Sequence, residues 1–343
     1  MAENDKKLLS VAIPCYNSQD YVERALNSII PAGARVEILV VDDGSTDGTA
    51  DIAKKYVEQY PDIVRYLHKE NGGHGDAVMF GIEHATGLYY RVLDSDDWFN
   101  TDNLIKMLDR LEAEQKNGNV FDMVVTNYVY EKTGCKRKKE VHYTSALPVE
   151  TPFTWDDMKN FRTGQYMLMH SIAYRLEILQ TCGLHLPKHT FYVDNLYAYY
   201  PLPFVEKIFY FNFDLYHYFI GREDQSVNEK QLFKRIEQQE HVAYLMFGMH
   251  DMDTIKNKRL RKYMSQYMAV LSAIVSALYV RMGGEENRQK KKDFWIRVQS
   301  RYKTSYKYFK KIFLVGVVRR TNPVFDTMTR IGYAICRRIY HFN

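Results

Sequence analysis

Three carboxylates stand within four residues in the stretch YYRVLDSDDWFN, at Asp94, Asp96 and Asp97. They directly follow an apolar run, so like charges gather where a segment with the composition of a buried strand ends. Carboxylates at alternate positions, such as Asp94 and Asp96, can turn toward one point, and oxygen ligands of this kind suit Mn²⁺ or Mg²⁺. An acidic turn can also simply cap a following helix, here the one predicted through LIKMLDRLEAEQ. The spacing alone leaves both interpretations open.

The hundred residues around this stretch alternate between strand and helix patterns. Four short runs have the composition of buried strands: residues 8–14, 36–41, 63–70 and 88–93. Three helical patterns separate them: residues 18–30 with Ser18 as the expected cap, 46–60 and 75–85. This order predicts a parallel α/β sheet with helices on both faces. Ligands bind such sheets beyond the carboxyl ends of the strands.

Polar residues follow all four predicted strands, in the segments PCYN, DDGS, NGG and DSDD. The chain has no GxGxxG after its first strand and no GxxxxGK[ST], so dinucleotide-binding and P-loop functions lose their main support. A site that receives a phosphorylated ligand with carboxylates needs a divalent cation, because like charges otherwise repel. The strand ends therefore predict a metal-assisted phosphate site.

Four motifs carry a family resemblance: SVAIPCYNSQDYVERALNSI, EILVVDDGSTDGT, NGGHG and VLDSDDW. In this order and spacing they resemble the nucleotide-sugar domain of family 2 glycosyltransferases, which have the GT-A fold. The likeness is dense over residues 8–100 and thinner to residue 230. It implies a GT-A domain at residues 1–230, with a donor half at 8–120 and an acceptor half at 121–230.

The resemblance also implies roles for residues at the strand ends. Asp96 and Asp94 would hold Mn²⁺ or Mg²⁺ with Asp97 in support, and the pair Asp42 and Asp43 would accept hydrogen bonds from the base and ribose. The other residues expected to border the donor are Pro14, Tyr16, Asn17, Gly72, Gly73 and Ser95. Each of them alone could serve only a turn or packing. Their joint occurrence at successive strand ends favours a donor site.

The stretch after NGG departs from the family pattern. Relatives commonly carry an Ala-Arg-Asn run whose Arg approaches the diphosphate, whereas this chain has Val78 and Met79 there. His74 or Lys69 could supply the missing positive charge, although a lone His is more often structural.

Inverting transfer to an acceptor hydroxyl needs a general base. The resemblance implies Asp194, in TFYVDNLYAYYPLP, with Val193 where relatives often have Glu. The aromatic surroundings of Asp194 would raise its pKa and favour this role, and the alternative is an N-cap of the segment NLYAYY. Asp156 and Asp157 are weaker candidates, because they resemble the start of a helix.

The segment LYHYFIGREDQSVNE resembles one that closes over the diphosphate in relatives. Arg222 would then pair with phosphate oxygens, and Gln225 and Ser226 would donate hydrogen bonds. A surface loop with an internal Arg–Glu pair is the alternative.

The net charge of +5 hides an asymmetry along the chain. Residues 286–343 hold 15 Lys and Arg against 3 Asp and Glu, a local charge of +12 that leaves −7 for the first 285 residues. Aromatic and apolar residues recur among these cations at three- or four-residue spacing, including Ile331 and Ile335. A basic amphipathic helix is typical of one that lies at an anionic membrane surface. Packing against the rest of the chain and binding of a polyanion are the alternatives, and no nucleic-acid motif supports the second.

Residues 231–343 are predicted to form a helical C-terminal region that ends in the basic tail 286–343. The apolar run 267–280 is short for a membrane span and predicts a buried helix. The N-terminus lacks the apolar core of a secretion signal. The cysteines do not form a CxxC motif, which argues against a zinc cluster. We expect a cytoplasmic protein, at the inner face of the plasma membrane.

The expected function is metal-dependent, inverting transfer of a sugar from a nucleotide sugar, with a UDP-sugar as the first candidate. The acceptor would be a hydroxyl group of a glycan or of a lipid-linked sugar in bacterial surface-polysaccharide synthesis. Nucleotidyl or phosphoryl transfer is the first alternative, because a DxD motif with Mg²⁺ also suits that chemistry. A non-catalytic nucleotide-sugar-binding protein on the same fold is the second.

Overall fold

The computed structural model describes residues 7–132, 134, 138–221, 225 and 228–340, without the side chains of residues 336–340. The chain divides into two compact units. Unit 1 comprises Met1–Met158 and Met167–Gly221, and unit 2 comprises Lys159–Tyr166 and Arg222–Asn343. The first unit therefore ends at residue 221, where the sequence analysis expects a boundary at residue 230, and a short internal segment belongs to the second unit.

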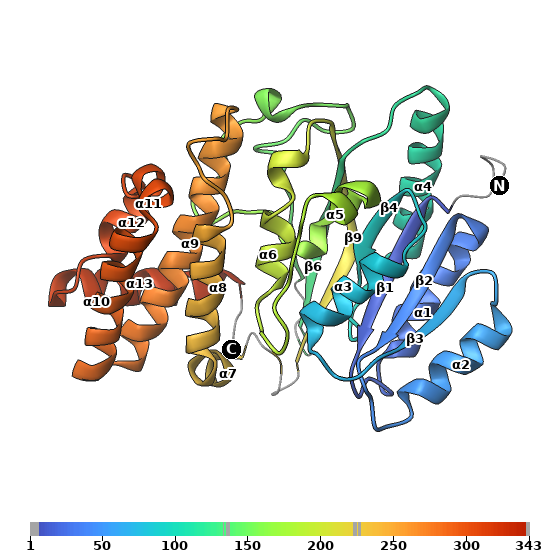
Figure 1. Cartoon of the computed structure of the whole chain (residues 1–343), viewed down its shortest axis with the longest axis horizontal. Helices are drawn as coiled ribbons and strands as arrows, with labels where there is room; N and C mark the ends of the chain where they lie inside the picture. Colours follow the sequence, from blue (N-terminus) through green and yellow to red (C-terminus); the bar gives the residue numbers. More distant parts are fainter. Residues whose placement is uncertain (1–6, 133, 135–137, 222–224, 226–227, 341–343) are drawn as a thin grey trace. The chain divides into compact units, whose positions relative to one another are not determined.

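Unit 1 is built on one mixed sheet with the strand order β3-β2-β1-β4-β8-β6-β9-β5, and β7 pairs with β6 (Figure 1). The strands are β1 (Leu9–Cys15), β2 (Val36–Asp42), β3 (Val64–His68), β4 (Tyr89–Val92), β5 (Trp98–Phe99), β6 (Met123–Lys132), β7 (Lys139–Val141), β8 (Ile172–Arg175) and β9 (Ile208–Ile220). Strands β3, β2, β1 and β4 run parallel. Strand β8 runs antiparallel to both of its neighbours, β4 and β6.

Helices cover both faces of this sheet, with α3, α5 and α6 in front of it in Figure 1 and α1, α2 and α4 behind. They are α1 (Val22–Ile29), α2 (Thr49–Gln59), α3 (His74–His84), α4 (Thr101–Lys116), α5 (Leu176–Thr181) and α6 (Asp194–Tyr199). Every residue of β1, β2 and β4 is buried, as expected of strands covered on both faces. The predicted α/β sheet with a parallel core is confirmed.

Two helix starts decide between interpretations of the sequence. Helix α4 is capped by Asn100, whose side-chain oxygen accepts a hydrogen bond from the backbone N–H of Asn103 at 3.0 Å, so the acidic cluster does not cap it. The prediction of Ser18 as the cap of α1 is wrong, because that helix begins three residues later, after Tyr21. The hydroxyl of Ser18 instead lies 2.8 Å from that of Ser95 in the acidic turn.

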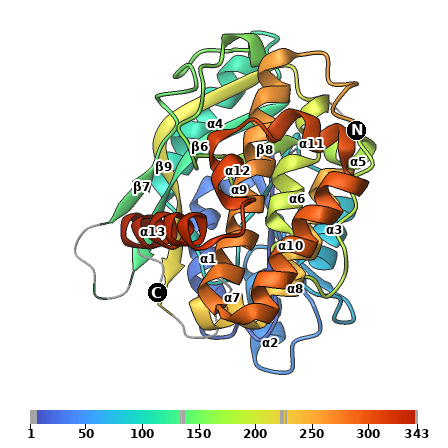
Figure 2. The ribbon, with the colours of Figure 1, turned by 90° about the vertical axis from the view of Figure 1, so that its left-hand side faces the viewer.

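From Glu229 onward, unit 2 is helical in the part of the chain that the structure describes, whereas its segment Lys159–Tyr166 has no regular secondary structure (Figure 2). Its helices are α7 (Glu229–Lys234), α8 (Ile236–Gly248), α9 (Lys258–Met282), α10 (Gly284–Arg301), α11 (Lys303–Phe309), α12 (Phe313–Val318) and α13 (Pro323–Tyr340). Helices α8 and α10 to α13 all pack against α9. Among the described residues α9 is the one helix long and apolar enough to cross a membrane, and 78% of its most apolar window is buried inside the protein. This burial fits a core helix.

Candidate active site

Side chains from three elements meet beyond the carboxyl end of β4, and Asp94 is their centre. Its Oδ1 lies 2.8 Å from Nε2 of His74, the first residue of α3. Its Oδ2 lies 3.4 Å from Nε2 of His170, in the short turn Met169–Ser171 that precedes β8. The Asp94 side chain is 23% exposed, so it remains accessible to a ligand. One carboxylate therefore sits between two imidazoles.

The electrostatics of this cluster favour opposite charges on its members. Burial alone would raise the pKa of Asp94, but the hydrogen bonds from His170 and His74 outweigh it and hold the pKa well below the ordinary value. Burial alone would lower the pKa of His74, but the hydrogen bond to Asp94 and the nearby charges raise it. The raised pKa favours the protonated, positively charged form of His74, on the same helix as the position where the family pattern has its Arg.

His170 is a site residue that no sequence motif indicates. It is buried, and its ring stacks on Tyr218 with the centroids 4.7 Å apart and meets the edge of Tyr216 at the same distance. The guanidinium of Arg91 donates a hydrogen bond to its backbone carbonyl. Its second ring nitrogen, Nδ1, is buried without a hydrogen-bond partner among the described residues. A lone His before a short strand gives no periodic or motif signal, so only the folded sheet reveals this position.

Asp97 connects the acidic turn to strand β9. The carboxylate is buried, accepts a hydrogen bond from the hydroxyl of Tyr216 at 2.5 Å, and accepts another from the backbone N–H of Phe219 at 2.7 Å. Burial, together with the charges of Asp96 and Asp94, raises its pKa well above the ordinary value. Both of its oxygens have partners within the protein, which fits the supporting role expected for it.

The residues at this edge include a set that fits a divalent cation. Ligand atoms of Asp94, Asp97 and His170 all lie within 4.8 Å of one another. Carboxylate oxygen and imidazole nitrogen together suit Mn²⁺, and carboxylate alone suits Mg²⁺. Asp96, the first ligand predicted from the sequence, is not in this set; its backbone carbonyl accepts a hydrogen bond from Arg24. A metal role for Asp96 stays a prediction.

Asp42 ends strand β2 with a carboxylate that is fully buried. It accepts hydrogen bonds from the backbone N–H of Ser45 at 2.9 Å and the hydroxyl of Tyr66 at 2.6 Å. Burial alone would raise its pKa, but these bonds lower it. The carboxylate therefore holds the loop after β2 in place, and contact with a base stays a prediction.

Asp43 holds the next loop of the site. Its carboxylate accepts hydrogen bonds from the backbone N–H groups of Gly72 at 2.9 Å and Gly73 at 2.7 Å, and from Lys69 at 2.8 Å. Lys69 also forms an ion pair with Asp76 at 2.5 Å. Lys69 is thus committed to two carboxylates of the protein, which leaves His74 as the better counterpart of the missing family Arg. The NGG segment is held by Asp43 in a fixed conformation.

The remaining predicted donor residues differ in their exposure to solvent. Pro14 is a buried residue of β1, paired with Val41 of the adjacent strand. Tyr16 is 56% exposed and Asn17 is also exposed, with a left-handed backbone conformation at φ 51° that Asn tolerates better than most residues. An exposed aromatic ring beside a strand end offers a surface on which a base can stack. Ser95 lies in the acidic turn itself.

The predicted base, Asp194, is the first residue of α6 and is half-buried. The N-cap position belongs to Val193, which makes no side-chain capping bond, so Asp194 is not the N-cap residue; its carboxylate accepts hydrogen bonds from the backbone and the side chain of Asn195. Burial raises the pKa of Asp194. Its carboxylate interacts electrostatically with three side chains of the cluster, His170, His74 and Asp94. Asp194 therefore belongs to the same site.

A contact between two loops brings Asp194 to this place. The backbone N–H of His189 donates a hydrogen bond to the carbonyl of Gly72 at 2.7 Å. The backbone of Gly73 has φ +85°, and a side chain there would meet the backbone of His189 at 3.0 Å. The weaker base candidates lie elsewhere: Asp157 forms a capping box with Thr154 at the start of a short helix, as the sequence predicts. Arg222 and Ser226 lie outside the described residues.

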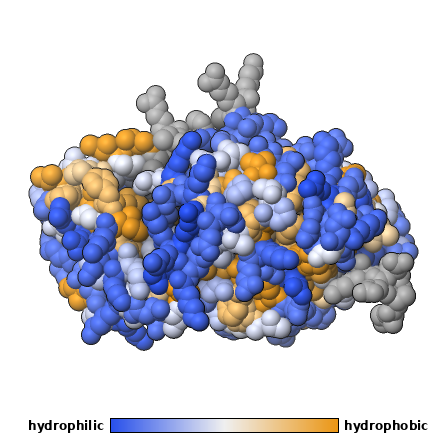
Figure 3. Space-filling view, turned by 90° about the horizontal axis from the view of Figure 1, so that it is seen from above, coloured by the Kyte–Doolittle hydropathy of each residue, from blue (hydrophilic) through white to orange (hydrophobic). Residues whose placement is uncertain are grey.

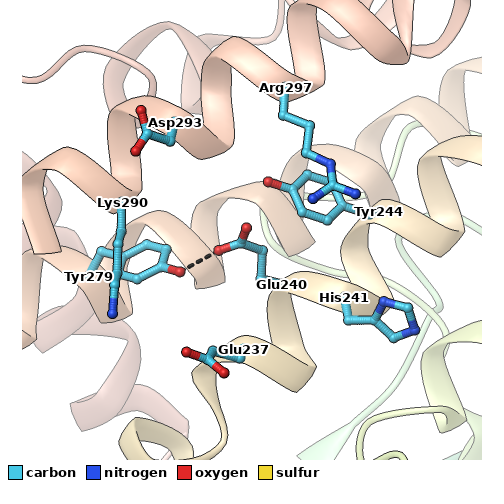
Figure 4. Close-up of a pocket in the computed structure, with 8 residues that line it drawn as sticks. All are labelled: Glu237, Glu240, His241, Tyr244, Tyr279, Lys290, Asp293 and Arg297. Carbon is cyan, nitrogen blue, oxygen red and sulfur yellow. Dashed lines mark hydrogen bonds between the residues drawn. The ribbon is translucent and has the colours of Figure 1, made fainter.

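A separate groove of about 400 Å³ lies within unit 2 (Figure 4). It is lined by Glu237, Glu240, His241, Tyr244, Tyr279, Lys290, Asp293 and Arg297. Its side chains contact one another: the hydroxyl of Tyr279 bonds to Glu240, and the guanidinium of Arg297 lies 4.3 Å from the ring centre of Tyr244. None of its residues follows a strand of the sheet, so it is not the site predicted from the motifs.

Comparison with known proteins places these residues in a family context. Residues 10–175 match the family described as Glycosyl transferase family 2. The uncharacterized glycosyltransferase MG060 of Mycoplasma genitalium is 28% identical over 210 residues, which cover 56% of this chain and 68% of that protein. The MG025 homolog of Mycoplasma pneumoniae, also an uncharacterized glycosyltransferase, is 43% identical over 99 residues, 27% of this chain and 33% of that protein.

Among solved structures, residues 1–349 of Staphylococcus aureus TarS superpose with a TM-score of 0.61 at 18% sequence identity. The superposition covers 91% of this chain and 90% of that one. At this identity the likeness shows a shared fold. It extends over both units, whereas the family match covers residues 10–175.

Proposed function

Because residues 10–175 form a glycosyltransferase family 2 domain, we propose that this chain transfers a sugar from a nucleotide-sugar donor to a hydroxyl group of a glycan or lipid-linked acceptor. The observation that carries the proposal is the cluster of Asp94, His74 and His170 beyond the carboxyl end of β4, together with Asp194, whose carboxylate interacts electrostatically with all three. Structures of TarS in complex with UDP and with UDP-GlcNAc support a uridine nucleotide as the donor. Surface-polysaccharide synthesis in the cytoplasm is the proposed context.

In this mechanism Asp194 is the general base. Its carboxylate takes the proton of the acceptor hydroxyl while that oxygen forms a bond to the anomeric carbon. The bond from that carbon to the diphosphate oxygen breaks at the same time, and the nucleoside diphosphate leaves from the opposite face, which inverts the configuration. A raised pKa makes Asp194 a better proton acceptor near neutral pH than an ordinary carboxylate.

The chain's other residues hold the departing group. Asp94, Asp97 and His170, with Asp96 as the sequence predicts, would bind Mn²⁺ or Mg²⁺, which supplies positive charge to the diphosphate when bound. His74 orients the Asp94 carboxylate through its hydrogen bond. Asp43 accepts hydrogen bonds from two N–H groups of the NGG segment, which hold this loop in its observed conformation.

Two other functions can be distinguished by their products. A nucleotidyl transferase would release pyrophosphate, whereas a glycosyltransferase releases free UDP from a UDP-sugar. A non-catalytic binding protein would release neither. The half-buried Asp194 favours catalysis, because a binding protein has no need of a carboxylate with a raised pKa beside the donor site.

The test is the replacement Asp194→Asn, which keeps the shape of the side chain and removes the proton acceptor. We expect release of UDP in the presence of Mn²⁺ and acceptor to fall by about 10²- to 10⁴-fold, the range for loss of a general base. Binding of UDP, measured by calorimetry with and without Mn²⁺, should stay within about twofold, because the base faces the acceptor.

The matched control is Asp156→Asn, an exposed carboxylate of a short helix, which should leave UDP release unchanged. Turnover of the Asp194→Asn variant at the wild-type rate would remove the base assignment. Loss of UDP binding in that variant would instead show a role toward the donor. Turnover that persists after chelation of all divalent cations would contradict the metal-dependent form of the proposal.

A further inference from the structure

Helix α13 presents apolar residues on the side that faces away from the rest of unit 2. Asp326 and Thr329 are 8% and 5% exposed and form its inner face. On the other side lie four exposed residues that we call the α13 stripe: Val324 at 66%, Met328 at 42%, Ile331 at 56% and Ile335 at 53%. With about 100° between successive residues of an α-helix, these four positions fall within about 60° of the helix circumference. The stripe is therefore one continuous surface.

Such a surface is unusual on the outside of a protein. Single exposed apolar residues are common, but a row of four over three turns marks an interaction site. In Figure 3 apolar residues gather at the left-hand end, where the C-terminal helices lie. Phe313, at the start of α12, adds an aromatic ring that is 79% exposed. The outer side of a surface helix would ordinarily carry polar residues instead.

The α13 stripe is held on a fixed support, because polar bonds join its helix to the rest of unit 2. The ammonium group of Lys291, which is 1% exposed, donates hydrogen bonds to Asp326 at 2.8 Å and to the carbonyl of Arg320 at 3.0 Å. The guanidinium of Arg330 donates to the carbonyl of Val280 at the end of α9. The helix thus presents its outer face in one orientation.

The charge around the stripe indicates what covers it. Exposed cations stand before and after α12, at Lys310, Lys311, Arg319 and Arg320. The whole segment 286–343 carries a net charge of +12. A second copy of the chain would bring two such segments together, and their like charges would repel. A partner that is apolar inside and negative at its surface satisfies both properties, and an anionic lipid bilayer is such a partner.

We propose that α13 lies in the interface of an anionic membrane, with the α13 stripe at the acyl-chain boundary and the surrounding Lys and Arg at the level of the lipid phosphates. Both contributions are needed, since an amphipathic helix binds through buried apolar area and attraction to anionic headgroups together. The inference is independent of the proposed sugar transfer, because it concerns lipid binding alone.

The experiment is flotation of the full chain with vesicles made of equal parts phosphatidylglycerol and phosphatidylcholine, and with vesicles of phosphatidylcholine alone. We expect the chain to bind the mixed vesicles and to bind the neutral ones at least about tenfold more weakly. The double variant Ile331→Glu/Ile335→Glu should bind the mixed vesicles at least about tenfold more weakly than the wild type, because two exposed apolar side chains that enter the acyl-chain boundary in the bound state become charged.

The control variant is Ile296→Glu on α10, which alters an isoleucine that is 62% exposed and lies outside the α13 stripe. It should bind vesicles as the wild type does, and both variants should melt at the wild-type temperature because all three sites are exposed. Equal vesicle binding by the double variant and the wild type would overturn the proposal, since charge alone would then explain the binding. Absence of vesicle binding, with a dimer in sedimentation that the double variant abolishes, would overturn it in favour of a second copy.

Discussion

A carboxylate near the amino end of strand β2, Glu37, is 4% exposed on its side chain and still interacts as an ion. It accepts hydrogen bonds from the hydroxyl of Ser10 at 2.5 Å and from the backbone N–H of Gly87 at 3.2 Å. Its Oε2 also lies 3.1 Å from Nη1 of Arg65. Burial alone would raise its pKa, but these partners, with the backbone of Thr86, lower it. The residue joins three parallel strands and the turn before β4.

We therefore predict that Glu37→Gln lowers the free energy of unfolding by about 1.5–3 kcal/mol at pH 7, the usual worth of hydrogen bonds to a charged group. A carboxylate whose folded pKa is depressed stabilises the protein above its unfolded pKa, and this contribution is lost as the pH falls through the folded pKa. The difference in unfolding free energy between the variant and the wild type should thus shrink as urea unfolding is repeated from pH 6 to values below 4.5, the ordinary pKa of a glutamate.

The control for this prediction is Glu177→Gln, which removes an exposed carboxylate whose side chain is 65% accessible and pairs with Arg175. It should change the unfolding free energy by less than about 1 kcal/mol. A difference for Glu37→Gln that grows at acid pH would contradict the assignment of a depressed pKa.

The residues of the site differ in how clearly the sequence indicates them. Asp94 and Asp194 each lie in a segment that resembles a family motif, and the fold brings their carboxylates close enough to interact electrostatically. His170 comes from a turn whose neighbours in the chain, Met169 and Ser171, carry no motif. It reaches Asp94 only because β8 pairs with β4, and pairing between residues so distant in sequence follows from the packing of the whole sheet.

At the scale of elements, a contact between the NGG segment and the loop before α6 positions the start of α6. Gly73 ends the NGG segment in a left-handed conformation, and the backbone of His189 passes within 3.0 Å of where a side chain would stand. The same loops share the hydrogen bond between His189 and Gly72. A glycine is required here for its conformation and for the close approach of a second backbone.

We predict that Gly73→Ala is more destabilising than Gly118→Ala, measured by thermal and urea unfolding. Gly118 has nearly the same backbone angle, φ +78° against +85°, but open space around it. Each variant bears the cost of a left-handed alanine, about 1 kcal/mol. Only Gly73→Ala adds a clash with backbone, which typically costs a further 1–3 kcal/mol, about the cost of overpacking.

The same Gly73 variant should also weaken UDP binding, because the NGG loop would move. Equal stability of the two variants would contradict the steric argument. Unchanged UDP affinity in Gly73→Ala would show that the loop does not border the donor.

The elements of the first hundred residues could be predicted because each carries its own pattern. The strand predicted at 36–41 is observed at Val36–Asp42, and the helix predicted at 75–85 at His74–His84. Periodicity reports which side of an element is buried, and that signal is local. The insertion of β8 between β4 and β6 could not be predicted, because a four-residue strand has too few positions to show a period.

At the scale of the whole molecule, the charge asymmetry and the core of unit 2 overlap in the same segment. Residues 286–343 hold the net charge of +12, yet Phe294, Trp295 and Val298 of α10 are at most 2% exposed and belong to the core around α9. The alternatives left by the sequence, packing and a basic surface, therefore do not exclude each other. The inner faces of these helices pack, and the outer side is basic.

We accordingly predict that deletion of residues 286–343 damages unit 2 beyond the loss of a charged surface. The apolar side of α9 would lose the helices that cover it, so fluorescence of a hydrophobic dye should rise and proteases should cut within residues 258–282. The full chain with Ile331→Glu/Ile335→Glu keeps α10 and should show neither change. A deleted chain with the dye response and cleavage pattern of the wild type would contradict this prediction.

The assignment of Lys159–Tyr166 to unit 2 makes the covalent path cross between the units three times. Phe161 and Tyr166 of this segment pack on Tyr263 and Tyr267 of α9, with ring centres 4.7 and 4.6 Å apart. A single cut after residue 221 therefore cannot release a complete helical unit, since two of its aromatic contacts would remain with the other fragment. Separation of the helical unit from the sheet unit in evolution would need a break at each of these three crossings, so the two units are expected to be inherited together.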